Sequence, residues 1–152
     1  MATQPANAWR TTLKRRLAVA AGSFLLWSVA IETPAESGGK DMRIVLLTDG
    51  AMATSGDYRN YFESGGQRFS HSIDPRTGRP TRHDLAAVTV AGDSAALADA
   101  LATALLVLGP DDGFSLATRE EIPAYFQIRM AGGFEQRATA AFLALEALHK
   151  SQ

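Results

Sequence analysis

The sequence predicts a mixed α+β fold with a largely antiparallel sheet, several β-hairpins and a helix packed against the sheet. Pairs of β-prone runs joined by glycine-containing turns are typical of antiparallel hairpins. One longer run, from Ser94 to Leu108, carries its apolar residues at helical spacing. With 152 residues, of which 46% are hydrophobic, the chain is long enough for one domain with a substantial core.

The first expected hairpin pairs a strand from Trp27 to Glu32 with a strand from Met42 to Leu47. Pro34 ends the first run, and the glycine turn at 37–39 reverses the chain. Asp49-Gly50 is a turn signal after the second run, and residues 51–56 are expected to connect this hairpin to the next.

The next segment contains a second hairpin signal, because β-prone runs at 58–63 and 67–71 flank Gly65-Gly66. Residues 74–80 are dense in turn-forming residues and are expected to form an ordered loop without regular elements. A further strand is expected from Leu85 to Val90.

The long helix has signals at both ends. Asp93 or Ser94 is suited to cap its N-terminus, and Gly109-Pro110 provides a stop after Leu108. The face directed to the core is expected to consist of the leucines at helical spacing, namely Leu97, Leu101, Leu105 and Leu108.

The remainder of the chain is expected to complete the sheet. Residues 111–121 indicate a turn and a short helix, and the alternation from Tyr125 to Met130 indicates a strand. The segment from Phe134 to His149 is apolar enough for a closing helix, or for a strand followed by a helix.

The composition excludes several classes of protein. Fifteen basic residues against sixteen acidic ones, a net charge of −1, argue against a non-specific nucleic-acid-binding protein. The absence of cysteine from the sequence excludes disulfides, thiolate zinc sites, iron–sulfur ligation and a lipid-attachment cysteine.

Residues 1–26 are interpreted as a leader, and residues 27–152 as the remaining domain. Three basic residues at 14–16 precede the apolar run 17–26, as in the basic and hydrophobic regions of a signal peptide. The run is short for a transmembrane helix. The alternative is an amphipathic or buried helix that leads into the strand at Trp27, and cleavage after Ala30 would destroy that strand.

A candidate metal site lies on the long helix. Asp99 and Thr103 are four residues apart, so their side chains point the same way, with Cβ atoms about 5–6 Å apart. Magnesium prefers oxygen ligands and usually takes one or two from protein, with phosphates and water completing its shell. The ordinary alternative is an acidic residue that favours the helix dipole, beside a threonine at the helix edge.

A second candidate is His71, at a strand end before a glycine- and proline-rich loop, where it could act as general acid or base. It could equally orient the loop through hydrogen bonds to the backbone. Asp74 is most simply a turn former, although it could orient His71. Asp57, Arg59 and Arg68 could bind phosphate, but mutual pairing or solvation is the simpler interpretation.

Three segments together resemble the ApbE-type flavin transferases, the FAD:protein FMN transferases. The blocks are Ala-Thr-Ser-Gly-Asp-Tyr-Arg-Asn-Tyr at 53–61, His-Ser-Ile-Asp-Pro-Arg-Thr-Gly-Arg-Pro at 71–80, and Leu-Ala-Asp-Ala-Leu-Ala-Thr at 97–103 followed by Val-Leu-Gly at 107–109. The resemblance begins near Trp27, whose strand is similar to another family block, and it continues to the C-terminus.

The resemblance implies magnesium-dependent cleavage of the FAD pyrophosphate and attachment of FMN to a Thr or Ser of an acceptor protein. In the family, the residues that match Asp99 and Thr103 hold Mg²⁺ against the FAD phosphates. The residue that matches His71 is an acid–base group near the acceptor hydroxyl. The backbone around the position of Ile73 lies against the flavin nucleotide.

The resemblance covers the C-terminal half of such an enzyme, because full-length members carry a comparable stretch before it. One expectation is therefore that the chain still binds Mg-FAD, with a homodimer as one way to complete the pocket. The alternative is a truncated, non-catalytic flavin- or partner-binding fragment. Family members usually act outside the cytoplasmic membrane, so a periplasmic location is expected if residues 1–26 act as a signal, and a cytoplasmic one otherwise.

Overall fold

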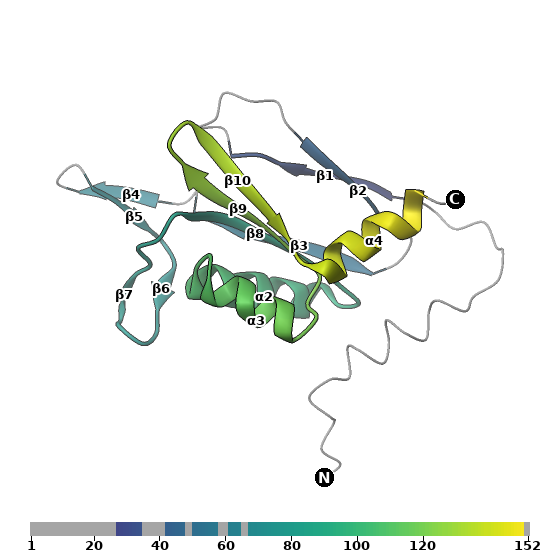
Figure 1. Ribbon diagram of the computed structural model, residues 1–152. Helices are drawn as coiled ribbons and strands as arrows, with labels where there is room; N and C mark the ends of the chain where they lie inside the picture. The colour runs from purple at the N-terminus through teal and green to yellow at the C-terminus, as the bar shows by residue number, and fades with distance from the viewer. Residues whose placement is uncertain (1–26, 35–41, 48–49, 58–60, 65–66, 151–152) are drawn as a thin grey trace, which may run out of the picture.

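The computed structural model describes residues 27–34, 42–47, 50–57, 61–64 and 67–150. The strands are β1 (Trp27–Glu32), β2 (Met42–Leu47), β3 (Ala51–Gly56), β4 (Tyr61–Ser64), β5 (Gln67–Ser70), β6 (Ile73–Asp74), β7 (Arg79–Pro80), β8 (Leu85–Gly92), β9 (Ala124–Met130) and β10 (Gly133–Ala138). The helices are α2 (Ala95–Leu108), α3 (Asp112–Arg119) and α4 (Ala140–Lys150) (Figure 1). The expected α+β class is confirmed.

The centre of the fold is an antiparallel sheet with the strand order β10-β9-β8-β3. Helices α2 and α3 lie on one side of it, and the β1–β2 hairpin and α4 lie on the other (Figure 1). The β4–β5 and β6–β7 pairs project from one end, so the molecule has a layered body with a hairpin extension (Figure 1). No helix in the described part of the chain has the length and apolar character needed to cross a bilayer.

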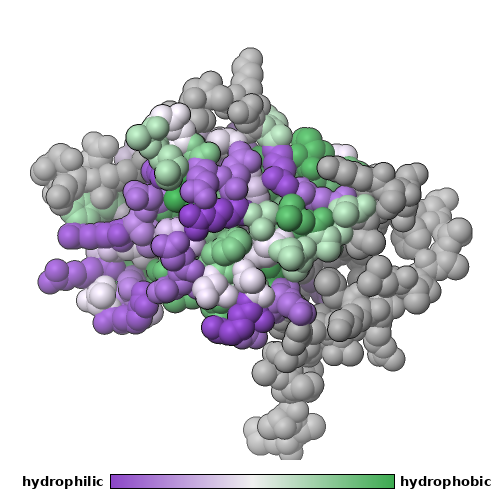
Figure 2. All heavy atoms as spheres, in the orientation of Figure 1, coloured by the Kyte–Doolittle hydropathy of each residue, from purple (hydrophilic) through white to green (hydrophobic). Residues whose placement is uncertain are grey.

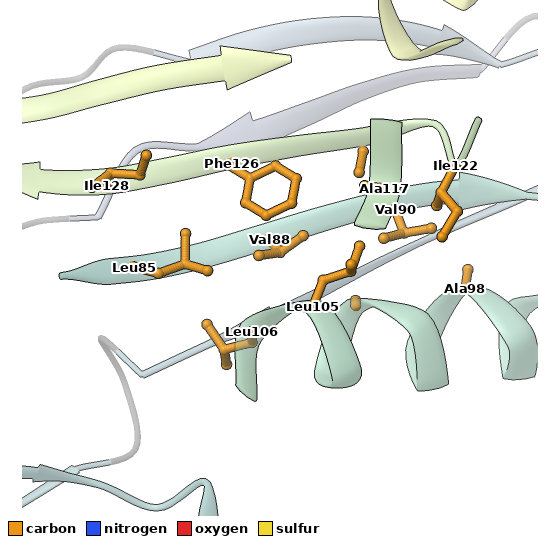
Figure 3. Packing of buried hydrophobic residues seen from close by; sticks show 12 residues of the cluster. Leu85, Val88, Val90, Ala98, Leu105, Leu106, Ala117, Ile122, Phe126 and Ile128 are labelled. Atoms are coloured by element: carbon orange, nitrogen blue, oxygen red, sulfur yellow. The ribbon is translucent and has the colours of Figure 1, made fainter. Parts of the chain in front are cut away.

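The main core lies between this sheet and the two helices. Val88 and Val90 of β8 and Phe126 of β9 point toward α2 (Figure 3). The Phe126 ring also meets the Phe114 ring of α3 edge-on, with 5.4 Å between the centroids. Since each large apolar side chain buried in this way contributes roughly 1.5–3 kcal/mol, this layer holds α2 firmly on the sheet.

A smaller core fills the other side of the sheet. Ile31 and Val45 of the β1–β2 hairpin pack against Tyr125 and Phe142. The Tyr125 and Phe142 rings are stacked, with 5.6 Å between centroids. Burial raises the pKa of the Tyr125 hydroxyl above its ordinary value of 10.0.

The expected core stripe on the long helix is partly wrong. Leu105 is fully buried, but Leu97 is 44% exposed and Leu108 is only half-buried. The residues of α2 that are buried are Ala98, Ala102, Leu105 and Leu106. Two alanines take the positions closest to the sheet because small side chains allow the helix backbone to approach it.

Two further expectations differ from the structure. Residues 51–56 form β3, which pairs with β8 along its whole length, although they were expected only to connect two hairpins. The 74–80 turn is closed by the two-residue β6–β7 ladder, in which Ile73 faces Pro80 and Asp74 faces Arg79. Both differences arise because pairing with a partner strand overrides weak local strand propensity.

The other expected elements are confirmed with small shifts of their bounds. The first hairpin pairs Trp27 with Leu47 and Glu32 with Met42. The closing segment is a strand followed by a helix, as one of the two expectations had it. Residues 1–26, the glycine turn at 37–39, Asp49, residues 58–60 and the Gly65-Gly66 turn lie outside the described residues.

Candidate active site

Helix α2 presents Asp99 and Thr103 at one edge, where both are exposed. The helix begins as expected, because the Ser94 hydroxyl accepts a hydrogen bond from the Leu97 N–H at 3.5 Å. It ends at Gly109, whose N–H donates to the carbonyls of Leu105 and Leu106. Its regular geometry places the two side chains one turn apart on the same edge.

That edge lies beside β3. The Ser55 hydroxyl oxygen is 2.8 Å from the Thr103 hydroxyl oxygen, and either one can donate the hydrogen bond. The first and third family blocks, 48 residues apart in sequence, therefore meet at one point between a strand and a helix. Sequence analysis did not single out Ser55, and only its place inside the first block was a signal.

The second block lies beside the same helix. His71 is exposed at the end of β5, and Ile73 is 50% exposed at the start of β6. Strand β6 packs next to α2, near the end of the helix that leads to α3 (Figure 1). The first and second blocks thus border α2, which carries the third block. The described part of the face in Figure 2 mixes hydrophilic side chains with apolar ones.

Asp74 does not orient His71, as one interpretation of the sequence had suggested. Its carboxylate instead binds the Arg76 guanidinium through three contacts of 2.9–3.1 Å and accepts the Arg76 N–H at 2.9 Å. Its backbone carbonyl accepts from the N–H groups of Thr77 and Gly78. These bonds to Arg76 lower the pKa of the Asp74 carboxyl group. The turn-forming role is therefore the correct one.

Asp57, another candidate for phosphate contact, forms an ion pair with Arg129 of β9. The Asp57 side chain is 13% exposed and that of Arg129 is 21% exposed. The Asp57 N–H also donates to the Ala86 carbonyl at 3.0 Å. Ion pairing of Asp57 was the simpler expectation, but the expected partners were Arg59 and Arg68, and the observed partner is Arg129 of β9. Arg59 and the Arg68 side chain lie outside the described residues.

The oxygen atoms on α2 suit a hard divalent cation. One carboxylate and one hydroxyl one turn apart match the one or two protein ligands that magnesium takes when phosphates and water complete its shell. The Asp99 side chain is exposed, so a ligand can reach its carboxylate from solvent. Within the described residues, no group of three His, Asp or Glu side chains is placed to hold a metal ion.

Comparisons with known proteins identify the family of this chain. The model of the ApbE family matches residues 17–126. The FAD:protein FMN transferase of Haemophilus influenzae is 43% identical over 117 residues, which are 76% of this chain and 34% of that protein. The corresponding protein of Escherichia coli is 40% identical over 114 residues, 75% of this chain and 32% of that protein.

Solved structures show the same relationship. The apo flavinyl transferase ApbE of Pseudomonas stutzeri superimposes with a TM-score of 0.69 at 48% identity, covering 79% of this chain and 36% of that one. The ApbE protein of Thermotoga maritima has a TM-score of 0.69 at 32% identity, covering 82% of this chain and 39% of that one. The fold and the motif blocks define a domain of the ApbE type. The chain belongs to the ApbE family, and it spans about a third of the length of the curated relatives it matches.

Proposed function

We propose that this chain carries the metal- and phosphate-binding side of an FAD:protein FMN transferase. The observation that carries the proposal is the meeting of the three family blocks along α2, with Ser55 bonded to Thr103. Relatives that are 40–43% identical over about three quarters of the chain bear this activity in their names. FAD is the proposed substrate, and the proposed second substrate is an acceptor protein with a target Thr or Ser.

In the proposed reaction the acceptor hydroxyl oxygen forms a bond to the phosphorus of the FMN half of FAD. The pyrophosphate P–O bond to the AMP half breaks, and AMP leaves with the bridging oxygen. The hydroxyl proton passes to the imidazole of His71, which is exposed at the end of β5. The backbone at Ile73 is proposed to lie against the flavin nucleotide.

Asp99 and Thr103 are proposed to hold Mg²⁺, which when bound neutralises charge on the phosphates. The role of α2 is to present both oxygen ligands in one fixed orientation, because the helix is anchored by the main core. The ion pair of Asp57 with Arg129 holds the end of β3, and with it the first block, in register.

The test is a titration of the full chain with FAD, followed by flavin fluorescence, with and without Mg²⁺. We expect binding that Mg²⁺ strengthens, and we expect Asp99→Ala to remove the Mg²⁺ effect while leaving the folded state intact by circular dichroism. The matched control is Asp93→Asn, an exposed carboxylate before the helix, which should retain the effect. Unchanged Mg²⁺ dependence in Asp99→Ala would overturn the metal assignment.

A second candidate function is flavin or partner binding without transfer. Incubation with FAD, Mg²⁺ and an acceptor protein separates the two functions. Covalently flavinylated acceptor supports the transferase, whereas FAD binding without product supports the binding function. Sedimentation of the FAD complex tests the proposed homodimer, since a second copy that completes the pocket should raise the mass on FAD binding.

The proposed location is outside the cytoplasmic membrane, and it is carried by the basic and apolar segment at 14–26. N-terminal sequencing of the protein from separated cell fractions tests it. A shortened N-terminus in the periplasmic fraction would support export, and an intact Met1 in the cytoplasmic fraction would contradict it.

A further inference from the structure

We propose that Ser55 is a positioning residue that orients the Thr103 hydroxyl for magnesium. The inference deepens the proposed function and rests on it. The carrying observation is the 2.8 Å separation between the Ser55 Oγ and Thr103 Oγ1 atoms, which joins β3 to the candidate metal edge of α2. Ser55 itself is not required to touch the cation or the nucleotide.

A fixed hydrogen-bond acceptor helps to orient a hydroxyl that binds a cation. A threonine hydroxyl that binds a cation through an oxygen lone pair must direct its O–H proton away from the cation, toward an acceptor. Ser55 Oγ is that acceptor. In the free protein either hydroxyl can donate. Metal binding would select the arrangement in which Thr103 donates and Ser55 accepts.

The bond to Ser55 also restricts the χ1 rotamer of Thr103. In a helix, threonine divides between two χ1 rotamers because its hydroxyl can return to the carbonyl of the preceding turn. For Thr103 that carbonyl belongs to Asp99 or Ala100. A bond to Ser55 competes with this local bond and holds the hydroxyl on the β3 side of the helix.

The strand places Ser55 reliably. Ser55 pairs with the fully buried Val88 of β8. Side chains alternate along a strand, so Ser55 shares a face with Ala53, which packs against the main core under α2. Thr54 points to the opposite face, where its hydroxyl bonds to that of the buried Thr89 at 2.8 Å. β3 is therefore held from both faces around Ser55.

The experiment measures Mg²⁺ affinity directly, by calorimetric titration of the FAD-saturated full chain. Removal of a group that orients a metal ligand typically costs about 10–100-fold in metal affinity. We expect that loss in Ser55→Ala, and also in Ser55→Cys, which keeps the shape but is a weak acceptor. Ser55→Thr keeps the hydroxyl on a β-branched side chain suited to a strand, and it should bind Mg²⁺ within about threefold of wild type.

Three controls keep the outcomes separate. FAD affinity without Mg²⁺ and the circular dichroism spectrum should be the same in all variants, which shows that the strand is intact. Asp99→Asn should lose Mg²⁺ binding in parallel, which shows that the measured site is the one on α2. A folded Ser55→Ala or Ser55→Cys protein with wild-type Mg²⁺ affinity would overturn the role of Ser55 while leaving the proposed function standing. A wild-type chain that binds FAD but no Mg²⁺ would overturn the metal site and the role of Ser55 together.

Discussion

Arg129 and Asp57 form a two-pronged ion pair that joins the middle of the sheet to the end of β3. Arg129 Nη1 donates to Asp57 Oδ2 at 3.0 Å, and Nη2 contacts Oδ1. The planar guanidinium matches the carboxylate, which makes this geometry stronger than a single contact. The two residues are 72 positions apart, so this pair couples the first family block to the fold by a long-range contact.

We predict that Asp57→Asn destabilises the protein by about 2–4 kcal/mol, because it removes the carboxylate charge that pairs with the largely buried Arg129 guanidinium. Urea denaturation monitored by circular dichroism measures the change. The control is Glu120→Gln, which breaks the Arg119–Glu120 contact, whose side chains are 66% and 42% exposed. That loss should be under about 1 kcal/mol. Equal effects of the two changes would contradict the structural role of the Asp57 pair.

Gly113→Ala is predicted to destabilise the packing of α3 against α2. A Cβ atom at Gly113 would lie 2.7 Å from the backbone carbonyl oxygen of Leu105. Alanine improves helix propensity by about 1 kcal/mol, but overpacking against rigid backbone costs about 1–3 kcal/mol. We therefore expect a net loss measured by thermal denaturation, while Ser115→Ala on the exposed side of α3 stays within about 0.5 kcal/mol of wild type. A gain of stability in Gly113→Ala would contradict this prediction, because it would show that α3 can shift away from the Leu105 carbonyl at little cost.

Thr139 is predicted to be the most sensitive hydroxyl of the C-terminal region. Its hydroxyl O–H donates to the Ile122 carbonyl at 2.8 Å, and its oxygen accepts from the N–H groups of Ala124 at 3.0 Å and Phe142 at 3.3 Å. Thr139→Val keeps the shape but leaves these buried backbone groups without a partner, at a cost of about 1–3 kcal/mol.

Denaturant unfolding of Thr139→Val and Thr139→Ser checks this prediction. The serine variant keeps the hydroxyl and should recover most of the lost stability. If both variants lose the same amount, the methyl group rather than the hydroxyl network is responsible.

The turn from Asp74 to Arg79 is predicted to weaken in acid. The Arg76 side chain and backbone N–H hold the pKa of Asp74 below its ordinary value of 3.8. The ionised carboxylate therefore stabilises the turn at pH values above 3.8, and this contribution is lost as the pH falls through the lower pKa of the folded state.

NMR titration of the Asp74 carboxyl carbon measures this shift. The midpoint should rise toward the ordinary value in Arg76→Ala, since its side-chain bond is the largest cause of the shift. It should stay low in Arg79→Ala, which removes an exposed charge from the same turn. A midpoint that does not respond to Arg76→Ala would contradict the assignment.

Much of the architecture could be predicted from local sequence because it depends on local patterns. The strands β1, β2 and β9 alternate or are strongly β-prone, and α2 has clear caps at Ser94 and Gly109. Strand β3 was missed because Ala51–Gly56 is rich in small residues with weak strand propensity, and it becomes a strand through pairing with β8. The leucine stripe failed for a related reason, since close approach to a sheet favours alanine over leucine.

The candidate site could also be predicted only in part from the sequence. Asp99 and Thr103 could be paired from their spacing alone, because a helix fixes the relation between positions four apart. The contact of Thr103 with Ser55 could not be predicted, because the two residues are 48 positions apart and their contact depends on how α2 packs on the sheet. His71 was a candidate from its position at a strand end, and Ile73 was named by resemblance. The structure places Ile73 in a strand that packs beside α2, and His71 is exposed two residues before it.

The alanines on α2 have a consequence for how this domain can evolve. Ala102 is fully buried against the sheet, and the next residue along the chain is Thr103. A larger side chain at position 102 would lift the helix from the strands and lengthen the gap that a single hydroxyl–hydroxyl contact now spans. The side-chain volume at position 102 and the separation of the Ser55 and Thr103 hydroxyls are therefore coupled. Substitutions at position 102 that ignore this coupling would change the Ser55–Thr103 contact and the geometry of the proposed metal site.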